Sequence, residues 1–358
     1  MEEKKKTARE IIEGYDGPPV RIMEVCGTHT HEIFRLGIRK LLPEQVELIS
    51  GPGCPVCVTQ VGFIDEAIYL ALERQVTICT FGDLVRVPGT NMSLAGAREK
   101  GAKIRIVYSP VDAKEYAKEH PKEQVTFLSV GFETTTPSAC LSVKKAREEG
   151  LTNYSILTAN KTMPQAYEAL KGSADIFLYP GHVNAITGTK LCEELAKEGV
   201  SGVVAGFTAK ELLTALAVAL ARFQEGRPFF VNCYPRVVTE NGSPQAQKLV
   251  EEMMEPCDSE WRGLGVIKGS GMRLQEEWSA FDARKKYKIP LIQGKANPAC
   301  RCGDVLQGKC KPSDCKVFGK VCTPQHPIGA CMVSGEGACS AYYMYGEAEK
   351  KLGVIYYE

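Results

Sequence analysis

The sequence predicts an α/β protein of two similar lobes, each with a parallel sheet of about four strands flanked by helices, followed by a cysteine-rich domain. Two observations support this prediction. Short apolar runs rich in β-branched residues alternate with helical patterns over most of the chain, and such alternation requires right-handed crossovers between parallel strands. Beyond about residue 294, glycine, proline and cysteine replace that pattern.

Eight strands are expected, and they form two evenly spaced sets of four. Each run is short and continuously apolar, which is typical of a sheet covered on both faces. The first set covers residues 20–25, 46–49, 76–81 and 104–108, and the second covers residues 125–130, 155–159, 176–179 and 202–205.

Helical patterns lie between most of these strands and also precede the first one. They cover residues 4–13, 59–73, 92–100, 139–149, 164–170, 188–198 and 209–222. The charged, proline-bearing stretch 112–124 separates the two sets of strands, and the pattern becomes irregular beyond residue 234. We therefore expect a first lobe over residues 18–119 and a second over residues 120–238. Residues 1–17 together with 239–358 would form the third domain.

Composition excludes several classes of function. The formal net charge is +1 and no long run of one sign occurs, so nothing indicates binding to nucleic acid or to an anionic membrane. The longest apolar stretch, residues 212–221, is too short to span a bilayer, and the charged N-terminus is unlike an export signal. We expect a cytoplasmic protein, monomeric when alone, in which stable disulfides are rare.

Polar motif residues follow six of the expected strands. Ligands of open α/β sheets bind outside the carboxyl ends of the strands, so two lobes with facing strand ends would gather these side chains in one cleft. The residues concerned are Cys26, Cys54, Asp83, Glu133, Asn160 and His182.

The first motif, CGTHTH at residues 26–31, joins a strand to a helix expected to start near Glu32. A thiol at a helix N-terminus favours the thiolate, and imidazoles at His29 and His31 can bind iron or carry protons. The alternative is a buried cysteine followed by histidines that cap the helix.

The second motif, GPGCPVC at residues 51–57, also follows a strand. Its Cys54 and Cys57 have the spacing of a redox dithiol, in which one thiolate attacks and the other resolves. The alternative is half of a structural zinc site, although the chain contains no second C-x-x-C.

The third motif, GFETTTP at residues 131–137, places Glu133 and three threonines on a tight turn after a strand. Glu133 can move protons or orient a ligand, and it can equally cap a helix.

Seven of the fifteen cysteines fall between Cys300 and Cys339. Four thiolates suffice for an iron–sulfur cubane or for zinc, and the irregular spacing alone does not select four from seven. The seven are Cys300, Cys302, Cys310, Cys315, Cys322, Cys331 and Cys339.

Taken together, these motifs resemble the HypD family of [NiFe]-hydrogenase maturation factors. The resemblance covers essentially the whole chain and includes CTP at residues 322–324 and CMVSGEGAC at residues 331–339. It implies a [4Fe-4S] cluster held by four cysteines separated by 14, 6 and 16 residues, which Cys300, Cys315, Cys322 and Cys339 satisfy. The last domain is then an iron–sulfur domain, and Cys302, Cys310 and Cys331 are packing or supporting thiols.

By this resemblance, the protein is a redox-active scaffold rather than a conventional turnover enzyme. Iron at Cys26, with His29 or His31 nearby, receives cyanide and carbon monoxide to form Fe(CN)2CO. The cluster would feed electrons to the Cys54/Cys57 dithiol, and Glu133 would donate or orient protons. The implied partners are the chaperone HypC, whose N-terminal cysteine shares the iron, and the cyanide donor HypE, with HypF and the hydrogenase large subunit involved indirectly.

Two other functions use part of the same motifs. An iron–sulfur-dependent thiol–disulfide oxidoreductase needs the C-terminal cysteines and the Cys54/Cys57 pair, but it has no use for Cys26 and its histidines. A non-catalytic binding module stapled by zinc needs only the C-terminal cysteines.

Overall fold

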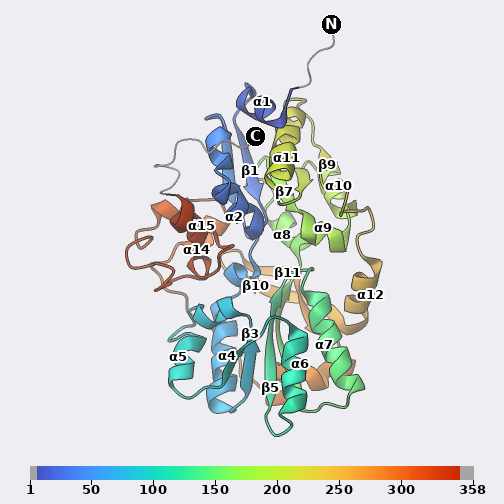
Figure 1. Ribbon diagram of the computed structural model, residues 1–358, viewed down its shortest axis with the longest axis vertical. Coiled ribbons are helices and arrows are strands. Elements are labelled where there is room, and N and C mark those ends of the chain that lie inside the picture. The colour runs from blue at the N-terminus through green and yellow to red at the C-terminus, as the bar shows by residue number, and fades with distance from the viewer. Residues whose placement is uncertain (1–5, 347–358) are drawn as a thin grey trace.

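The computed structural model describes residues 6–346, and its strands form two sheets flanked by helices (Figure 1). The first sheet has five parallel strands in the order β2-β1-β7-β8-β9. Their bounds are β1 Val20–Glu24, β2 Val46–Ser50, β7 Ile176–Pro180, β8 Ser201–Ala205 and β9 Phe230–Asn232.

The second sheet has six strands in the order β10-β11-β6-β5-β3-β4. Strands β3 to β6 pair with one another in parallel, whereas β10 and β11 form an antiparallel hairpin, of which β11 pairs antiparallel with β6. Their bounds are β3 Thr77–Thr80, β4 Ile104–Ile106, β5 Val125–Gly131, β6 Tyr154–Lys161, β10 Met254–Trp261 and β11 Gly265–Leu274.

Fifteen α-helices and five short 3-10 helices lie within the described residues. The α-helices are α1 Ala8–Glu13, α2 Gly27–Arg35, α3 Pro55–Val58, α4 Val61–Glu73, α5 Leu94–Glu99, α6 Pro110–Glu119, α7 Thr136–Glu148, α8 Met163–Ala169, α9 Gly181–Thr187, α10 Lys190–Lys197, α11 Ala209–Phe223, α12 Pro244–Met253, α13 Ala283–Tyr287, α14 Cys302–Leu306 and α15 Ala338–Tyr345. The 3-10 helices are η1 Ile38–Leu41, η2 Gly82–Arg86, η3 Glu276–Phe281, η4 Pro312–Asp314 and η5 Ala330–Met332. Between residues 6 and 346, no helix combines the length and apolar character needed to cross a membrane.

Both sheets carry helices on both faces, as the apolar strands predict. In the five-stranded sheet, Val20 and Ile22 of β1 pack with residues of α1, α2 and α11, whereas Met23 faces the opposite side with residues of α8 and α10. This alternation is the period of two that a strand imposes. The six-stranded sheet packs on α4 and α5 on one side and on α6, α7 and α12 on the other.

All eight expected strands are present, but their expected grouping was wrong. The first four strands do not share a sheet, because β1 and β2 pair with β7 while β3 and β4 pair with β5. The expected boundary at residues 119–120 thus falls between β4 and β5, two strands of one sheet. Local patterns specify strands, but strand order depends on which apolar faces meet in three dimensions.

Three local expectations also need correction. The charged stretch at 112–124 is mostly helix α6, which begins with a capping box between Ser109 and Asp112. The region beyond residue 234 is not wholly irregular, since it contains α12 and the β10–β11 hairpin. The N-terminal helix starts at Ala8, and residues 4 and 5 of its expected span lie outside the described residues.

The cysteine-rich segment folds into the short elements α14, η4, η5 and α15, which lie beside α2 (Figure 1). Helix α15 packs on α2, where the rings of Phe34 and Tyr342 lie 4.5 Å apart. Helix α15 therefore covers α2, the helix that follows β1.

Candidate functional site

The loops that carry Cys26 and Cys54 lie in direct contact. They follow β1 and β2, which are parallel neighbours, so both loops leave the same edge of the sheet. The Gly27 amide donates a hydrogen bond to the Gly53 carbonyl at 3.0 Å, and a Cβ placed on Gly27 would stand 3.2 Å from the Cβ of Cys54. A Cβ placed on Gly53 would overlap the backbone of Cys26. Glycine is therefore required where the two loops meet.

The buried carboxylate of Glu24 connects the elements that carry these two loops. Glu24, at the end of β1, accepts hydrogen bonds from Thr30 of α2 at 2.6 Å and from Ser50 at the end of β2 at 3.3 Å. Arg39 forms an ion pair with the same carboxylate. Since Glu24 is fully buried, its charge needs these partners, and the network fixes the positions of β1, β2 and α2 relative to one another.

Two properties of Cys26 differ from the sequence prediction: its position relative to the start of α2 and the pKa of its thiol. Helix α2 starts at Gly27, so Cys26 is itself the N-cap residue. Burial raises the pKa of the Cys26 thiol to about 12, although the amides of His29 and Thr28 act in the opposite direction. The expected thiolate at a helix start is thus outweighed by loss of water, because the side chain is only 1% exposed.

The two histidines of the first motif have different surroundings. His29 is fully buried, and its Nε2 lies 3.0 Å from the Gly206 carbonyl, while its Nδ1 has no hydrogen-bond partner. A carbonyl can only accept, so Nε2 carries the hydrogen and Nδ1 keeps a free lone pair. In His31 both nitrogens are engaged, Nδ1 with the Gly335 carbonyl at 3.0 Å and Nε2 with the Tyr345 hydroxyl at 3.4 Å.

A third imidazole, His182, lies near His29. It lies in the first turn of α9, after β7, which is the other neighbour of β1. Its ring stacks on Phe207 at 5.1 Å, and the His29 ring lies 4.9 Å from the same ring. Burial lowers the pKa of His182 to about 4, and burial with the nearby His182 lowers that of His29 to about 3. Both rings are therefore neutral at physiological pH, which is the form that binds metals. The strand-end rule had singled out His182 but gave it no role.

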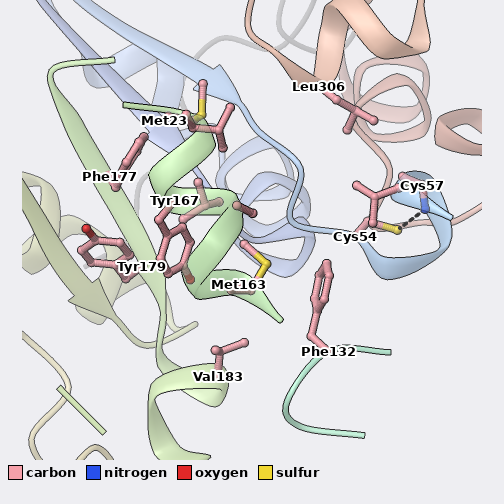
Figure 2. Packing of buried hydrophobic residues seen from close by; sticks show 14 of the residues in the cluster. Met23, Cys54, Cys57, Phe132, Met163, Tyr167, Phe177, Tyr179, Val183 and Leu306 are labelled. Carbon is pink, nitrogen blue, oxygen red and sulfur yellow. Dashed lines mark hydrogen bonds between the residues drawn. The ribbon is translucent and has the colours of Figure 1, made fainter. Parts of the chain in front are cut away.

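The Cys54/Cys57 pair sits at the start of α3 in a buried cluster with Phe132 (Figure 2). The Cys57 amide donates to the Cys54 sulfur at 3.4 Å, so the two residues form the tight turn that a redox dithiol needs. Cys57 also contacts Cys331. That contact lowers the pKa of the Cys57 thiol, but Cys54 and burial raise it more, and it stays well above its usual range.

Thiol contacts continue from Cys57 toward the C-terminal cysteines. Cys331 touches Cys57, Cys302 and Cys339, and Cys302 touches Cys300. Because Cys302 and Cys331 are buried, this series of thiols is largely closed to water. The sequence had left both residues as packing or supporting thiols, and spacing alone contains no signal that they connect the two motifs.

The four cysteines that the resemblance selects line one small cavity. Cys300, Cys315, Cys322 and Cys339 surround it together with Cys302, Cys331 and apolar side chains such as Val317 and Phe318. Cys310 is not among the lining residues. Within residues 6–346, no three His, Cys, Asp or Glu side chains converge closely enough for a single metal ion.

The cysteine-rich lining of this cavity is compatible with iron–sulfur binding. A cubane spreads its four thiolates over four irons, so the sulfurs need not converge as they must around one ion. Gly329 leaves the necessary space, since a Cβ there would stand 2.5 Å from the Cys300 sulfur. The Ile328 amide donates to the Cys322 sulfur at 3.4 Å, a contact that stabilises a ligand thiolate.

Glu133 lies on the loop that follows β5. Its Oε1 accepts a hydrogen bond from the Met163 amide at 2.8 Å, so the carboxylate reaches the start of α8 as well as its own loop. Part of the residue is exposed, but Oε2 is buried and unpartnered, and this burial raises the pKa of Glu133 to about 7.

The β10–β11 hairpin, absent from the sequence prediction, joins the motifs. Trp261 stacks on Phe132 of the third motif at 5.8 Å. Arg262 donates two hydrogen bonds to the Thr59 carbonyl, at 3.0 and 2.9 Å, just after α3. The Gly263 carbonyl accepts from Gln307 at 2.6 Å, next to α14. The hairpin thus touches three of the four thiol- or carboxylate-bearing segments, namely the Glu133 loop, the end of α3 and the end of α14.

The fold and these loops define an α/β protein with two sheets and a cysteine-rich C-terminal region that is compatible with iron–sulfur binding. Comparison with known proteins places it more narrowly. The family model described as HypD, hydrogenase formation hypA family, matches residues 2–346. This chain therefore belongs to the HypD family.

Individual relatives agree with this assignment. The hydrogenase maturation factor HypD of Cupriavidus necator is 42% identical over 347 residues, which cover 93% of this chain and 92% of the relative. The protein of the same name from Rhodobacter capsulatus is 44% identical over 340 residues, covering 92% and 90%. That from Escherichia coli K12 is 42% identical over 341 residues, covering 93% and 91%.

Proposed function

We propose that this chain is a hydrogenase maturation factor that holds iron at Cys26 while the iron receives cyanide and carbon monoxide. The observation that carries the proposal is the series of buried thiols that runs from the cysteine-lined cavity through Cys302 and Cys331 to Cys57. It ends at the Cys54 loop, which rests on the Cys26 loop. A site for cargo iron and a source of electrons are thereby joined.

Iron would be bound by the Cys26 sulfur and by neutral imidazole. The free Nδ1 of His29 is one candidate donor, and His182 is another, since neither of its ring nitrogens has a hydrogen-bond partner among residues 6–346. Iron accepts thiolate and imidazole together. Because the Cys26 thiol is strongly disfavoured as a thiolate, iron must displace its proton on binding. His31, with both nitrogens engaged, is the weaker candidate.

The dithiol would supply the electrons for cyanide transfer. Cleaving a thiocyanate-like S–C bond into thiolate and cyanide takes two electrons, and oxidation of Cys54 and Cys57 to a disulfide releases two electrons and two protons. Glu133, with a pKa near neutrality, can accept one of those protons. A [4Fe-4S] cluster held by Cys300, Cys315, Cys322 and Cys339 would supply single electrons to restore the dithiol.

The names of the relatives support maturation partners for this chain. We propose that HypC shares the iron and that HypE delivers cyanide made with HypF, before the Fe(CN)2CO unit passes to the hydrogenase large subunit. The cytoplasm is the proposed compartment, since thiols of this kind must remain reducible.

Two single substitutions test the division between cargo and cluster. Protein purified without oxygen in the presence of HypC is assayed for iron and acid-labile sulfide. Cys26→Ala should remove the cargo iron and leave about four iron and four sulfide per chain. Cys300→Ala should remove the sulfide while leaving the Cys26 loop intact. Loss of both pools by either change would contradict the proposal.

An iron–sulfur-dependent thiol–disulfide oxidoreductase remains the second candidate. The continuous series of thiols favours it, because the same series could reduce an external protein disulfide. Such an enzyme would not need Cys26. Turnover of a generic disulfide by both the wild type and Cys26→Ala, without any partner, would support this second function.

A further inference from the structure

Each cyanide transfer in the proposed function uses two electrons, so electrons must enter the chain from outside. One side of the cysteine-lined cavity is formed by a loop that reaches solvent. Val317 and Phe318 line the cavity, and their loop is exposed to solvent at Lys316, Lys320 and Val321. This loop connects Cys315 directly to Cys322.

The surface around this loop combines positive charge with apolar side chains. Between residues 309 and 320 there are four lysines and one aspartate, and that aspartate, Asp314, caps the Lys311 amide at 2.8 Å. Neither Lys316 nor Lys320 pairs with a carboxylate within residues 6–346.

Three large apolar side chains are exposed on this loop and on α15, which meets the loop through Tyr343 and Phe318. Val321 is 62% exposed, Met344 44% and Tyr343 38%, and the Tyr343 ring lies 6.3 Å from that of Phe318. We call the surface formed by Lys316, Lys320, Val321, Tyr343 and Met344 the loop face. A small apolar centre with unpaired charge beside it is typical of transient protein contacts, in which charge guides the approach.

We propose that the loop face docks a small acidic one-electron carrier protein, which reduces the cluster through the Cys315–Cys322 loop. The proposal rests on the cluster of the proposed function and adds the kind of partner that serves it. An acidic carrier complements the unpaired lysines, and the apolar centre provides the contact that brings its redox group next to the cavity. A small-molecule reductant would need neither feature.

The test uses a reduced acidic [2Fe-2S] ferredoxin as the probe and the full chain purified without oxygen. Lys316→Glu combined with Lys320→Glu reverses the charge of the loop face. Lys190→Glu combined with Lys197→Glu makes the same change in net charge at the two ends of α10, on the opposite side of the molecule (Figure 1). Stopped-flow absorbance gives the rate constant for cluster reduction by ferredoxin and, separately, by dithionite. Fluorescence anisotropy gives the affinity for labelled oxidised ferredoxin.

The loop-face variant should react with ferredoxin at least about tenfold more slowly than the wild type at low ionic strength. The difference should narrow near 1 M salt, where the Debye length is about 3 Å. The affinity should fall in parallel, whereas the α10 variant and every dithionite rate should match the wild type.

Equal ferredoxin rate constants and affinities for the two variants would overturn the docking proposal. Absence of any dithionite-reducible cluster in the wild type would instead overturn the proposed function. The anisotropy measurement would still decide whether the loop face binds an acidic protein.

Discussion

Gly53 lies against Cys26 so closely that the two loops share one backbone contact surface. A hydrogen bond from the Gly27 amide to the Gly53 carbonyl also joins the two loops. Cys54 follows Gly53 directly in the chain. The position of the dithiol is therefore set by the same backbone atoms that set the position of the Cys26 sulfur.

Gly53→Ala should force the two loops apart. The added methyl group overlaps backbone, which cannot rotate away as a side chain can, so we expect a loss of about 1–3 kcal/mol in the free energy of unfolding. Anaerobic urea unfolding measures this loss. Gly82→Ala is the matched control, since its nearest neighbour would be the Ile106 Cγ2 at 3.8 Å, and its effect should stay within about 0.5 kcal/mol. Similar losses for both variants would contradict the contact.

Replacement of Glu133 should change how stability depends on pH. Its pKa is about 7 in the folded protein against an ordinary value of 4.5, so between these values only the unfolded chain loses the proton. The free energy of unfolding of the wild type should therefore fall, relative to Glu133→Gln, as pH rises from about 4.5 to 7, and the gap should be constant above that range. We expect a total change of about 3–4 kcal/mol. Denaturation series at pH 5, 6, 7 and 8 measure it, and a gap independent of pH would contradict the raised pKa.

Cys26 should resist alkylation in the free protein. Its thiol is 1% exposed with a pKa of about 12, so little thiolate exists at pH 8 and the reagent cannot reach it. Iodoacetamide labelling followed by mass spectrometry should modify the partly exposed Cys310 at least about tenfold faster. In urea the two rates should converge. Equal rates in the folded protein would mean that the Cys26 loop opens readily without a partner.

Arg262→Gln should loosen the tip of the hairpin from α3. Its guanidinium makes two hydrogen bonds to one carbonyl, and losing these charge-assisted bonds should cost about 1.5–3 kcal/mol in urea unfolding. Arg262→Lys should recover part of the loss. The control is Arg236→Gln, which breaks an exposed pair with Glu211 and should cost less than about 1 kcal/mol. An effect of Arg262→Gln no larger than the control would show that the hairpin is held by apolar packing alone.

The sequence predicted individual strands well because each parallel strand is buried on both faces and reads as a short apolar run. Residues 125–131 of β5, for example, are buried without exception. In the hairpin strand β10 only the first and last residues are buried. This strand also contains Pro256 and three acidic residues, so it lacks the apolar run. Strand order was beyond reach for a different reason: nothing local in β3 indicates that its partner is β5 rather than β2.

In the candidate site, too, local features could be predicted from the sequence, whereas features that depend on distant residues could not. The motifs identified the loops that carry Cys26, Cys54 and Glu133, because glycine and polar residues at strand ends are local features. The acidity of Cys26 could not be predicted in the same way. It depends on burial to which residues more than 300 positions later contribute, including Glu336, whose carboxylate accepts a hydrogen bond from Thr28 at 2.7 Å.

The way the chain alternates between its two sheets also has a consequence for biosynthesis. Strands β1 and β2 must wait for β7, so about 125 residues of intervening chain have to emerge from the ribosome before the first sheet can gain its third strand. Strand β6 likewise waits for β11 to complete the second sheet. Pairing over such distances slows folding and leaves apolar strand edges unprotected meanwhile. A nascent chain of this kind should depend on general chaperones until its cysteine-rich end has been made.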